Sequence, residues 1–388
     1  MKAILILFTK KHFINIFSAA FLLFIGALFV FKYSVRYGSV FVLSPVLFIT
    51  AGILLLFIIN KKSQTYDTTF TTKQLFPVLG FLFLVTVSMA FIPQSTRVGR
   101  FPAMLEWLSN FQQGIFPYGT KTNPSGFPVL FFLASPFYLI GDAGYLEVFG
   151  LFLFMMLLLK SVKTKKEYYL KMFLLLFLPT TFYELIVRSE LFTNTVLIIS
   201  LFFLAEQKLH EQERNISFFI LALMFGFFLS TRLIAFLWFA MFLLFFFRNN
   251  LKNGVIFLAI ALSVFLLSLL PFYLWNAETF INKGPFAVQT IYLPKWIFFV
   301  FPFFVLYAGW MIADFQELLF TSGVLTILLV SISMMVTIGD VGISEAIFNS
   351  RFDISYYALS VPFFILALKE YKIDWFLGKV YPNEIQKL

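Results

Sequence analysis

The chain has 388 residues, of which 61% are hydrophobic and only 12% are charged, and 59 residues are Phe. This composition excludes a soluble domain and predicts a polytopic membrane protein with many helical spans. A net charge of +10 would suggest nucleic acid as the partner of a soluble protein, but the basic residues here lie between apolar runs, where the positive-inside rule explains them. We therefore expect no nucleic-acid partner. The chain has no Cys, which excludes disulfides, thiolate catalysis and Cys-ligated metals.

The apolar runs predict an all-α membrane protein with about twelve transmembrane helices, within a range of about 11 to 13. The runs cover residues 13–32, 39–60, 75–93, 145–160, 170–183, 191–206, 217–231, 232–247, 254–273, 295–312, 319–337 and 354–368.

The segment 94–127 is too polar to span a bilayer and too apolar to be a solvated linker. A short helix is predicted in it, beginning at Pro102 and ending at Gly114. Four apolar residues recur at helical spacing on one face of this helix, whereas Glu106 and other polar residues share the opposite face. The apolar residues are Phe101, Leu105, Leu108 and Phe111. The pattern predicts an amphipathic helix in the membrane plane, with its apolar side in the acyl region.

The apolar segment 127–141 decides the topology. At 15 residues it would be roughly 22 Å long as a helix, against a hydrocarbon core of about 30 Å, and Pro136 lies inside it. If it does not cross, 19 of the 29 Lys and Arg residues lie on the cytoplasmic side; if it crosses, only 11 do. The positive-inside rule favours the first arrangement. We therefore expect a re-entrant segment in a large first outer loop, 94–144, and both termini in the cytoplasm.

In this topology almost all the unusual polar residues lie on the extracytoplasmic side. Charges near the hydrocarbon boundary are costly unless they face a cavity or a partner, so they are functional candidates, although solvation at the headgroups explains many of them. The outer carboxylates are Glu106, Asp142, Glu147, Glu184, Glu190, Glu278, Asp340, Glu345 and Asp353. The outer cations include Arg97, Arg100, Lys121, Arg188, Arg232, Lys283, Lys295 and Arg351.

Two of these residues have specific alternatives. Glu190 begins an apolar helix with Asn194 one turn further on the same face, so it is either a catalytic carboxylate or a residue favoured by the helix dipole. Arg232 lies within the apolar stretch 217–247, where it either snorkels to the interface or binds a phosphate. The outer aromatic residues form either an interfacial belt or a platform for a lipid or sugar. They are Trp107, Phe116, Tyr118, Trp275, Tyr292 and Trp296.

Several short motifs occur in the order that is found in C-type, multi-spanning glycosyltransferases. The motifs are Gln113-Gly-Ile-Phe-Pro-Tyr118, Asn123-Pro-Ser-Gly-Phe-Pro-Val-Leu, Arg188-Ser-Glu-Leu-Phe-Thr-Asn194, Leu229-Ser-Thr-Arg232 and Pro271-Phe-Tyr-Leu-Trp-Asn-Ala-Glu-Thr-Phe280. In these motifs the chain resembles the polyprenyl-phosphate-sugar-dependent, mannosyltransferase-like members of that class. One position departs from the family: where an Asp stands about fourteen residues before the Gly of its G-x-x-P-Y turn, this chain has Arg100.

The resemblance implies an enzyme, an inverting hexosyltransferase that moves a mannose-like sugar from a polyprenyl phosphate to a glycan or lipid acceptor. It implies a catalytic core in 75–300, flanked by an N-terminal transmembrane hairpin in 1–74 and C-terminal helices with a cytoplasmic tail in 301–388. The displacement needs a carboxylate base and cations for the departing phosphate. The base would be Glu190 or Glu106. The phosphate would be bound by Arg232, Arg188, Arg351 or Arg100, and the acceptor or lipid by Trp107, Tyr118, Asn194 and Trp275.

Other assignments stay open at this point. A glycan polymerase also needs a large outer loop, and a lipid-linked oligosaccharide flippase or other transporter is the alternative outside enzymes. Transporters show internal repeats and charges at the midplane, whereas the charges here cluster on one face. No metal ligand set and no particular cofactor is predicted, although a divalent cation remains an alternative because outer carboxylates are plentiful. We expect the protein in the plasma (inner) membrane, in contact with its lipids, with its active site on the extracytoplasmic side.

Overall fold

The structure is a computed structural model that describes residues 2–35, 38, 42–62, 75–93, 96, 99–209 and 214–369. Every element in these ranges is helical and none is a strand, which confirms the all-α fold. The first eight helices are α1 Lys2–Ser34, α2 Ser44–Lys62, α3 Leu75–Phe91, α4 Arg100–Gln112, α5 Pro128–Leu139, α6 Tyr145–Ser161, α7 Lys165–Phe177 and α8 Pro179–Val187.

The second half of the chain begins with the buried helix α9, Leu191–Lys208. It continues with α10 Ile216–Leu229, α11 Ala235–Phe247, α12 Leu251–Trp275, α13 Ala277–Lys283, α14 Pro285–Thr290, α15 Ile297–Met311 and α16 Phe315–Ile343. A π-helical turn η5, Ser344–Phe348, a 3-10 helix η6, Ile354–Ser360, and α17, Val361–Ala367, complete the described chain. Gly342 has a φ of 82° and breaks the end of α16, a conformation that favours glycine.

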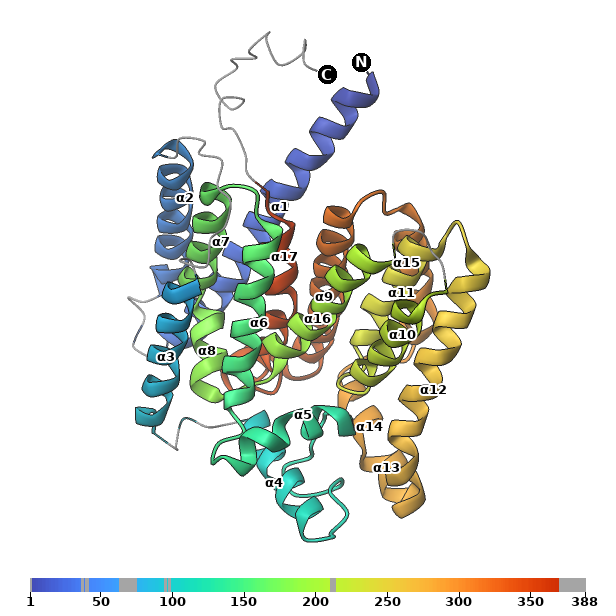
Figure 1. Cartoon of the computed structure of the whole chain (residues 1–388). Coiled ribbons are helices and arrows are strands. Elements are labelled where there is room, and N and C mark those ends of the chain that lie inside the picture. The colour runs from blue at the N-terminus through green and yellow to red at the C-terminus, as the bar shows by residue number, and fades with distance from the viewer. Residues whose placement is uncertain are drawn as a thin grey trace.

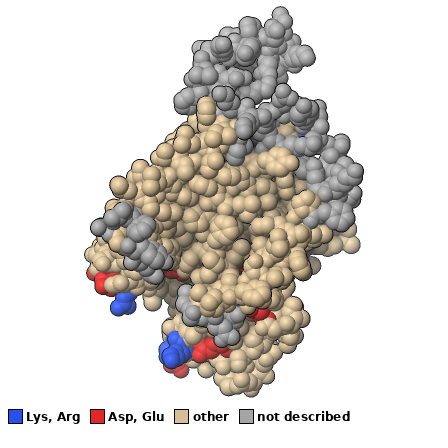
Figure 2. All heavy atoms as spheres, turned by 90° about the vertical axis from the view of Figure 1, so that its left-hand side faces the viewer, with Lys and Arg blue, Asp and Glu red and all other residues tan. Residues whose placement is uncertain are grey.

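Helix length and hydropathy support a multi-pass membrane protein. Four described helices are long and apolar enough to span a membrane, and a fifth span results if α7 and α8, which meet at a 56° bend, count as one. Seven further apolar helices of 10–17 residues are shorter than a straight span. Twelve spans and the orientation in the membrane therefore stay predictions. The face in Figure 2 agrees with a lipid-exposed bundle, because its visible acidic and basic groups gather in the lower part.

Most helices run along a common axis, and two opposite ends of the bundle can be recognised (Figure 1). The start of α1 and the end of α17 lie at one end, where the Lys369 backbone N–H donates to Asn15 Oδ1 at 3.0 Å. Helices α4, α5, α13 and α14 lie at the other end. The described chain ends are therefore on the same side of the bundle, and helices α4 and α5 are on the opposite side.

Helix α5 covers most of the segment predicted to be re-entrant. It is only 12 residues long, and in Figure 1 it lies crosswise at the end of the bundle rather than along it. The backbone N–H groups of Phe127 and Val129 donate to the carbonyls of Thr231 and Ser230, each at 3.0 Å. The beginning of α5 is therefore fixed to the turn between α10 and α11.

The apolar face of α4 packs against protein, not into the acyl region as the sequence suggested. Trp107 is fully buried and stacks on Phe131 of α5 with ring centroids 4.4 Å apart. The buried face also contains Phe101, Met104 and Leu108, whereas the predicted face member Phe111 is 37% exposed. The helix begins at Arg100, two residues before the predicted start. The prediction of the acyl region was wrong because an apolar face has the same helical spacing whether it packs against lipid or against protein.

The abundance of Phe has a structural counterpart in the helix core. The ring of Phe242 lies 4.4 Å from that of Phe225 and 5.2 Å from that of Phe202, which joins α9, α10 and α11. Between aromatic layers, small residues allow close approach of the helices. A Cβ at Gly226 would lie 2.3 Å from the backbone oxygen of Ala261, so α10 and α12 meet without side chains between them at this point.

Candidate functional site

Three buried or nearly buried arginines lie at the loop end of the bundle, and each forms an ion pair with a carboxylate from another segment. Arg100 pairs with Asp353 at 2.8 Å, Arg188 pairs with Asp142, and Arg232 pairs with Glu190. The pairs join α4, the segments after α5 and α8, the turn before α11 and the start of η6. A buried charge is tolerated only with such a partner, so these contacts also determine how the segments are arranged.

Glu190, a predicted base, forms a buried ion pair with Arg232, a predicted phosphate ligand. The two side chains are 2% and 3% exposed. Glu190 lies just before α9, and Arg232 lies in the turn between α10 and α11, where it also donates through Nη1 to Ser125 Oγ at 3.3 Å. Burial would raise the pKa of Glu190, but Arg232 and then Arg100 lower it below its usual value. Glu190 is therefore an ionised carboxylate next to a guanidinium.

Arg100 stands at the position where the resembling family has an acid. Its Nη2 lies 2.8 Å from Asp353 Oδ2, and Nη1 and Nη2 donate to Ser355 Oγ at 2.9 and 2.8 Å. Its guanidinium also lies 4.6 Å from the ring centroid of Tyr356. Burial would raise the pKa of Asp353, but Arg100 and the hydrogen bonds from Ser355 lower it. Asp353 thus brings an ionised carboxylate next to position 100 from a distant part of the chain.

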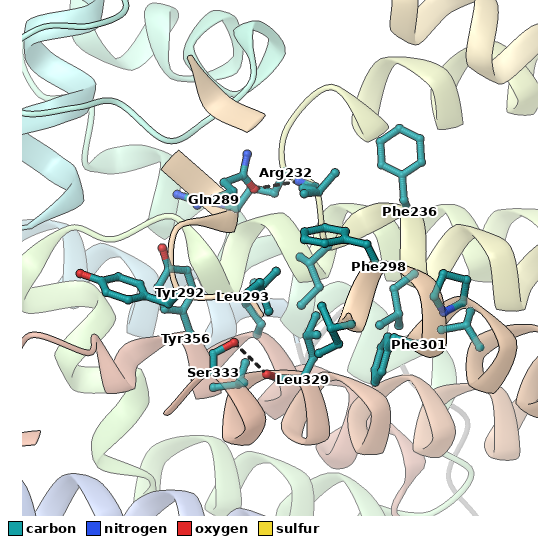
Figure 3. A pocket seen from close by; sticks show the side chains of 18 of the residues that line it. Arg232, Phe236, Gln289, Tyr292, Leu293, Phe298, Phe301, Leu329, Ser333 and Tyr356 are labelled. Atoms are coloured by element: carbon teal, nitrogen blue, oxygen red, sulfur yellow. Dashed lines mark hydrogen bonds between the residues drawn. The ribbon is translucent and has the colours of Figure 1, made fainter. Parts of the chain in front are cut away.

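Two cavities meet at Arg232. The larger has a volume of about 480 Å³ and is bounded by α11, α14, α15, α16 and the start of η6; we call it the apolar groove (Figure 3). Its lining is mostly apolar, for example Leu237, Phe301 and Val330, and Arg232 lies at one end. The smaller cavity, about 10 Å³, is lined by Arg100, Ser125, Glu190 and Arg232 among others. That volume admits about one water molecule.

Arg188 is placed away from both cavities. It closes α8 in the left-handed conformation, with a φ of 58°, and its Nη2 donates to the carbonyl of Met89 at 2.8 Å. Its aliphatic stem lies against Gly144, where a Cβ would be 2.5 Å from Cδ. The residue therefore joins α3, α8 and the start of α6. It lines neither of the two cavities, in which a phosphate could be bound.

Glu106, the second predicted base, holds the loop after α4 in place. Its Oε2 accepts hydrogen bonds from Thr120 Oγ1 at 2.9 Å, from the Thr122 backbone N–H at 3.0 Å and from Thr122 Oγ1. The hydrogen bonds from Thr122 and Thr120 lower the pKa of Glu106. It is absent from the lining of both cavities.

The residues predicted to bind the acceptor, and the remaining phosphate-binding candidate Arg351, lie in different surroundings. Tyr118 is buried and donates through its hydroxyl to the Gly126 carbonyl at 3.1 Å. Asn194 is 2% exposed in α9, and its side-chain amide has no partner in the described chain. Trp275 is 43% exposed and lies 5.6 Å from the ring of Phe116. Trp107 has no exposed face for a ligand, and Arg351 is exposed outside the two cavities.

Sequence reasoning missed three residues of this site. Ser125 and Ser355 contact Arg232 and Arg100, and Gln289 accepts from the Leu233 backbone N–H at 2.8 Å. None of the three is charged; Ser125 lies in one of the quoted motifs, but the resemblance gives that position no role, and Gln289 and Ser355 lie outside the motifs. Within the described ranges, no group of three His, Cys, Asp or Glu residues lies close enough to hold a metal ion.

Fold and site define a helical multi-pass membrane protein with a buried ionic cluster beside an apolar groove. No protein family, no curated protein and no solved structure matches the chain.

Proposed function

We propose that the protein is an inverting glycosyltransferase that takes its sugar from a polyprenyl-phosphate donor. The observation that supports the proposal best is the position of Arg232, which lies both at the end of the apolar groove and in the small polar cavity with Glu190. A lipid phosphate has an apolar chain and an anionic end, which match the apolar groove and the cationic Arg232. The sugar and the reaction class rest on the resemblance in the sequence motifs.

The groove suits the hydrocarbon chain of the donor. Its lining from Ile234 to Leu359 is contributed by five elements and is mostly apolar side chains, so a chain placed there exchanges contacts with lipid tails for contacts with side chains along its length. A phosphate at the Arg232 end would be held by a guanidinium, which binds phosphate oxygens with charge-assisted hydrogen bonds.

The reaction assigns opposite roles to Arg232 and Glu190. The acceptor hydroxyl oxygen forms a bond to the anomeric carbon, while the bond from that carbon to the phosphate oxygen breaks and its electron pair leaves with the lipid phosphate. Glu190 accepts the hydroxyl proton, and Arg232 stabilises the charge on the departing phosphate. Attack from the face opposite the phosphate inverts the configuration.

Glu190 is a better candidate base than Glu106. Glu190 Oε2 has no hydrogen-bond partner in the described chain and the carboxylate lines the small cavity, whereas Glu106 is occupied by the loop. The acceptor would reach Glu190 from the small cavity, whose lining also includes Pro124, Ser125 and Gly126. Because about 10 Å³ cannot hold a sugar, the proposal requires this cavity to widen when the acceptor binds.

The test is a transfer assay with the full-length protein in nanodiscs, using radiolabelled mannosyl and glucosyl phosphate lipids and envelope glycans as acceptors. We expect one sugar to be added in inverted configuration and Glu190→Gln to slow the addition by about 10²–10⁴. A ladder of long products would instead identify a polymerase. Movement of intact labelled lipid between the leaflets of a vesicle, with no transfer from any donor, would contradict the proposal and identify a flippase.

A further inference from the structure

Two buried acids beside the three arginine ion pairs have no ion pair of their own in the described chain. The arginines are paired with Asp353, Asp142 and Glu190. Glu147 at the start of α6 and Glu184 in α8 are left over, although they are only 3% and 0% exposed. A buried carboxylate without a cation is costly, so the charge of these two acids has to be removed in another way.

Glu184 lies where a negative charge is unfavourable. It belongs to the last turn of α8, where the helix dipole repels a carboxylate. Neither of its side-chain oxygens has a hydrogen-bond partner in the described ranges, and the residue lines neither cavity. Oxygens enclosed in this way have no space for a water molecule or a larger ligand, whereas a proton needs none.

Glu147 contacts a hydroxyl group that has two neighbours and only one hydrogen. Thr193 Oγ1 lies 2.6 Å from Glu147 Oε2 and 3.3 Å from the carbonyl oxygen of Leu146. A hydroxyl can donate one hydrogen and accept others. Each contact therefore has its own hydrogen when Glu147 is protonated and donates to Thr193, while Thr193 donates to Leu146. A Cβ at Gly150 would overlap Thr193 Oγ1, so the close packing of α6 on α9 fixes the hydroxyl there.

We propose that Glu147 and Glu184 form a proton-binding site, in which both carboxyl groups hold a proton at neutral pH. The site lies where α6, α8 and α9 meet, and it does not depend on the proposed transfer of a sugar. With both protons bound, the three arginines are balanced by three carboxylates. Buried acids of membrane helices are rare and mark functional sites, among them sites of proton binding.

The charged groups that act on the two acids come from several elements. Arg100 of α4 attracts the ionised form of Glu184, whereas Glu190 and Asp353 repel it. Glu147 is acted on by Glu184 and Glu190, both of which are acidic. The negative groups therefore outnumber the positive ones around this site, which favours the protonated pair.

The other titratable groups on the elements packed against α8 are engaged elsewhere. Lys32 of α1 acts on Asp353, and the charged residues of α7 lie in its first two turns, away from its junction with α8. The tyrosines also have other contacts: Tyr183 packs on Tyr33, Tyr356 packs on Arg100, and the Tyr357 hydroxyl contacts Ser331 Oγ.

Two alternatives give the same arrangement of side chains. Glu147 could be ionised, because it lies in the first turn of α6, where the helix dipole favours a negative charge. A sodium ion could take the place of the proton at Glu184. Glutamine separates these cases from the proposal, since it has the shape of a protonated glutamate but neither carries a charge nor binds a proton.

The experiment is infrared spectroscopy of the full-length protein with isotope-labelled glutamate, at neutral pH in a detergent without ester groups. A protonated carboxyl group has a C=O stretching band that an ionised carboxylate lacks, and the label shifts this band to lower frequency. We expect two such components in wild type, of which Glu147→Gln removes one and Glu184→Gln the other. Glu278→Gln is the matched control, because Glu278 is an exposed carboxylate on α13, and it should leave both components unchanged.

A wild-type spectrum without the band, or with a band that neither variant changes, would overturn the proposal. Loss of a component in only one of the two variants would overturn the assignment to a pair. A wild-type thermal midpoint that is higher in sodium chloride than in choline chloride at equal ionic strength, with the difference lost in Glu184→Gln, would identify a sodium site instead. If Glu184→Gln does not fold, Glu184→Asp replaces it, and its component should lose the isotope shift.

Discussion

Arg232 and Glu190 are separated by 42 positions in the sequence and form an ion pair in which neither side chain is more than 3% exposed. Moving both charges out of water costs free energy that their attraction offsets only when the geometry is good. Apolar residues of similar volume would fill the same space without this cost. Arg232 lines both cavities and Glu190 lines the smaller one, so the proposed function places the reaction at this pair.

The first prediction concerns the energetics of this pair. We expect Arg232→Met to reduce the free energy of unfolding by about 3–5 kcal/mol, because it leaves Glu190 buried without this counter-ion. The double variant Arg232→Met, Glu190→Met should recover most of the loss while losing transfer activity. Denaturant titrations of the four proteins of the double-mutant cycle measure the coupling. Additive losses would show that the two charges do not interact as described.

The second prediction concerns catalysis by Glu190. Removing a general base costs about 10²–10⁴ in rate, so Glu190→Gln should reduce transfer by that factor when rates are compared per folded protein. Glu278→Gln is the control, because Glu278 is an exposed carboxylate on α13 at the same end of the bundle. In native mass spectrometry, farnesyl phosphate, a short lipid phosphate, should still bind to Glu190→Gln, since the removed charge repels the phosphate. Equal transfer rates in the two variants would exclude Glu190 as the base.

The third prediction concerns the apolar groove. Ala240 of α11 lines it, so Ala240→Trp should fill part of the groove and weaken farnesyl phosphate binding by about tenfold or more, which is about 1.4 kcal/mol. Ala259→Trp on α12 adds the same ring at an exposed position outside the groove and should bind like wild type. Unchanged binding in Ala240→Trp would place the lipid elsewhere.

The fourth prediction concerns pH and the loop after α4. Hydrogen bonds from Thr122 and Thr120 place the pKa of Glu106 in the folded protein below its ordinary value of 4.5. The ionised carboxylate therefore stabilises the loop above that value, and this contribution is lost as pH falls through the lowered pKa. Hydrogen–deuterium exchange of the peptide containing Thr122, corrected for intrinsic rates, should show protection at neutral pH that is lost at a pH below the lowered pKa of Glu106.

Glu106→Gln is the diagnostic variant for this loop. Its exchange should be faster than that of wild type at neutral pH and should no longer change between the two pH values, because the neutral amide does not titrate. Protection that falls equally in wild type and Glu106→Gln would assign the pH effect to another group, such as Asp353.

The fifth prediction concerns the contact between α10 and α12. Gly226→Ala would place a Cβ 2.3 Å from the Ala261 carbonyl oxygen, so the helices must separate, at a cost of about 1–3 kcal/mol. Gly80→Ala in α3 has no atom within 4 Å of the new Cβ and should be neutral or slightly stabilising, because Ala favours helix over Gly by about 1 kcal/mol. Thermal midpoints in the same detergent compare the two. Equal midpoints would show that the helices are not in contact at Gly226.

The sequence by itself determined the class of protein and the composition of its core. Apolar runs with few charges require helices, because a backbone in lipid must satisfy its hydrogen bonds internally, and the structure has only helices in its described parts. Gly114 indicated where α4 has ended, since glycine tolerates a positive φ. Glu190 and Arg232 were recognisable as site candidates because a charge beside an apolar helix costs free energy unless it faces a cavity or a partner.

Only the tertiary structure decided which charges meet. Arg100 and Ser355 are 255 positions apart, and no periodicity extends over such a distance, so neither this contact nor the Arg100–Asp353 pair could be predicted. Helical spacing could not show that Trp107 faces α5 instead of lipid, because an apolar face has the same pattern in either environment. Gln289 had no signal at all, since only the folded chain brings its amide oxygen to the backbone N–H of Leu233.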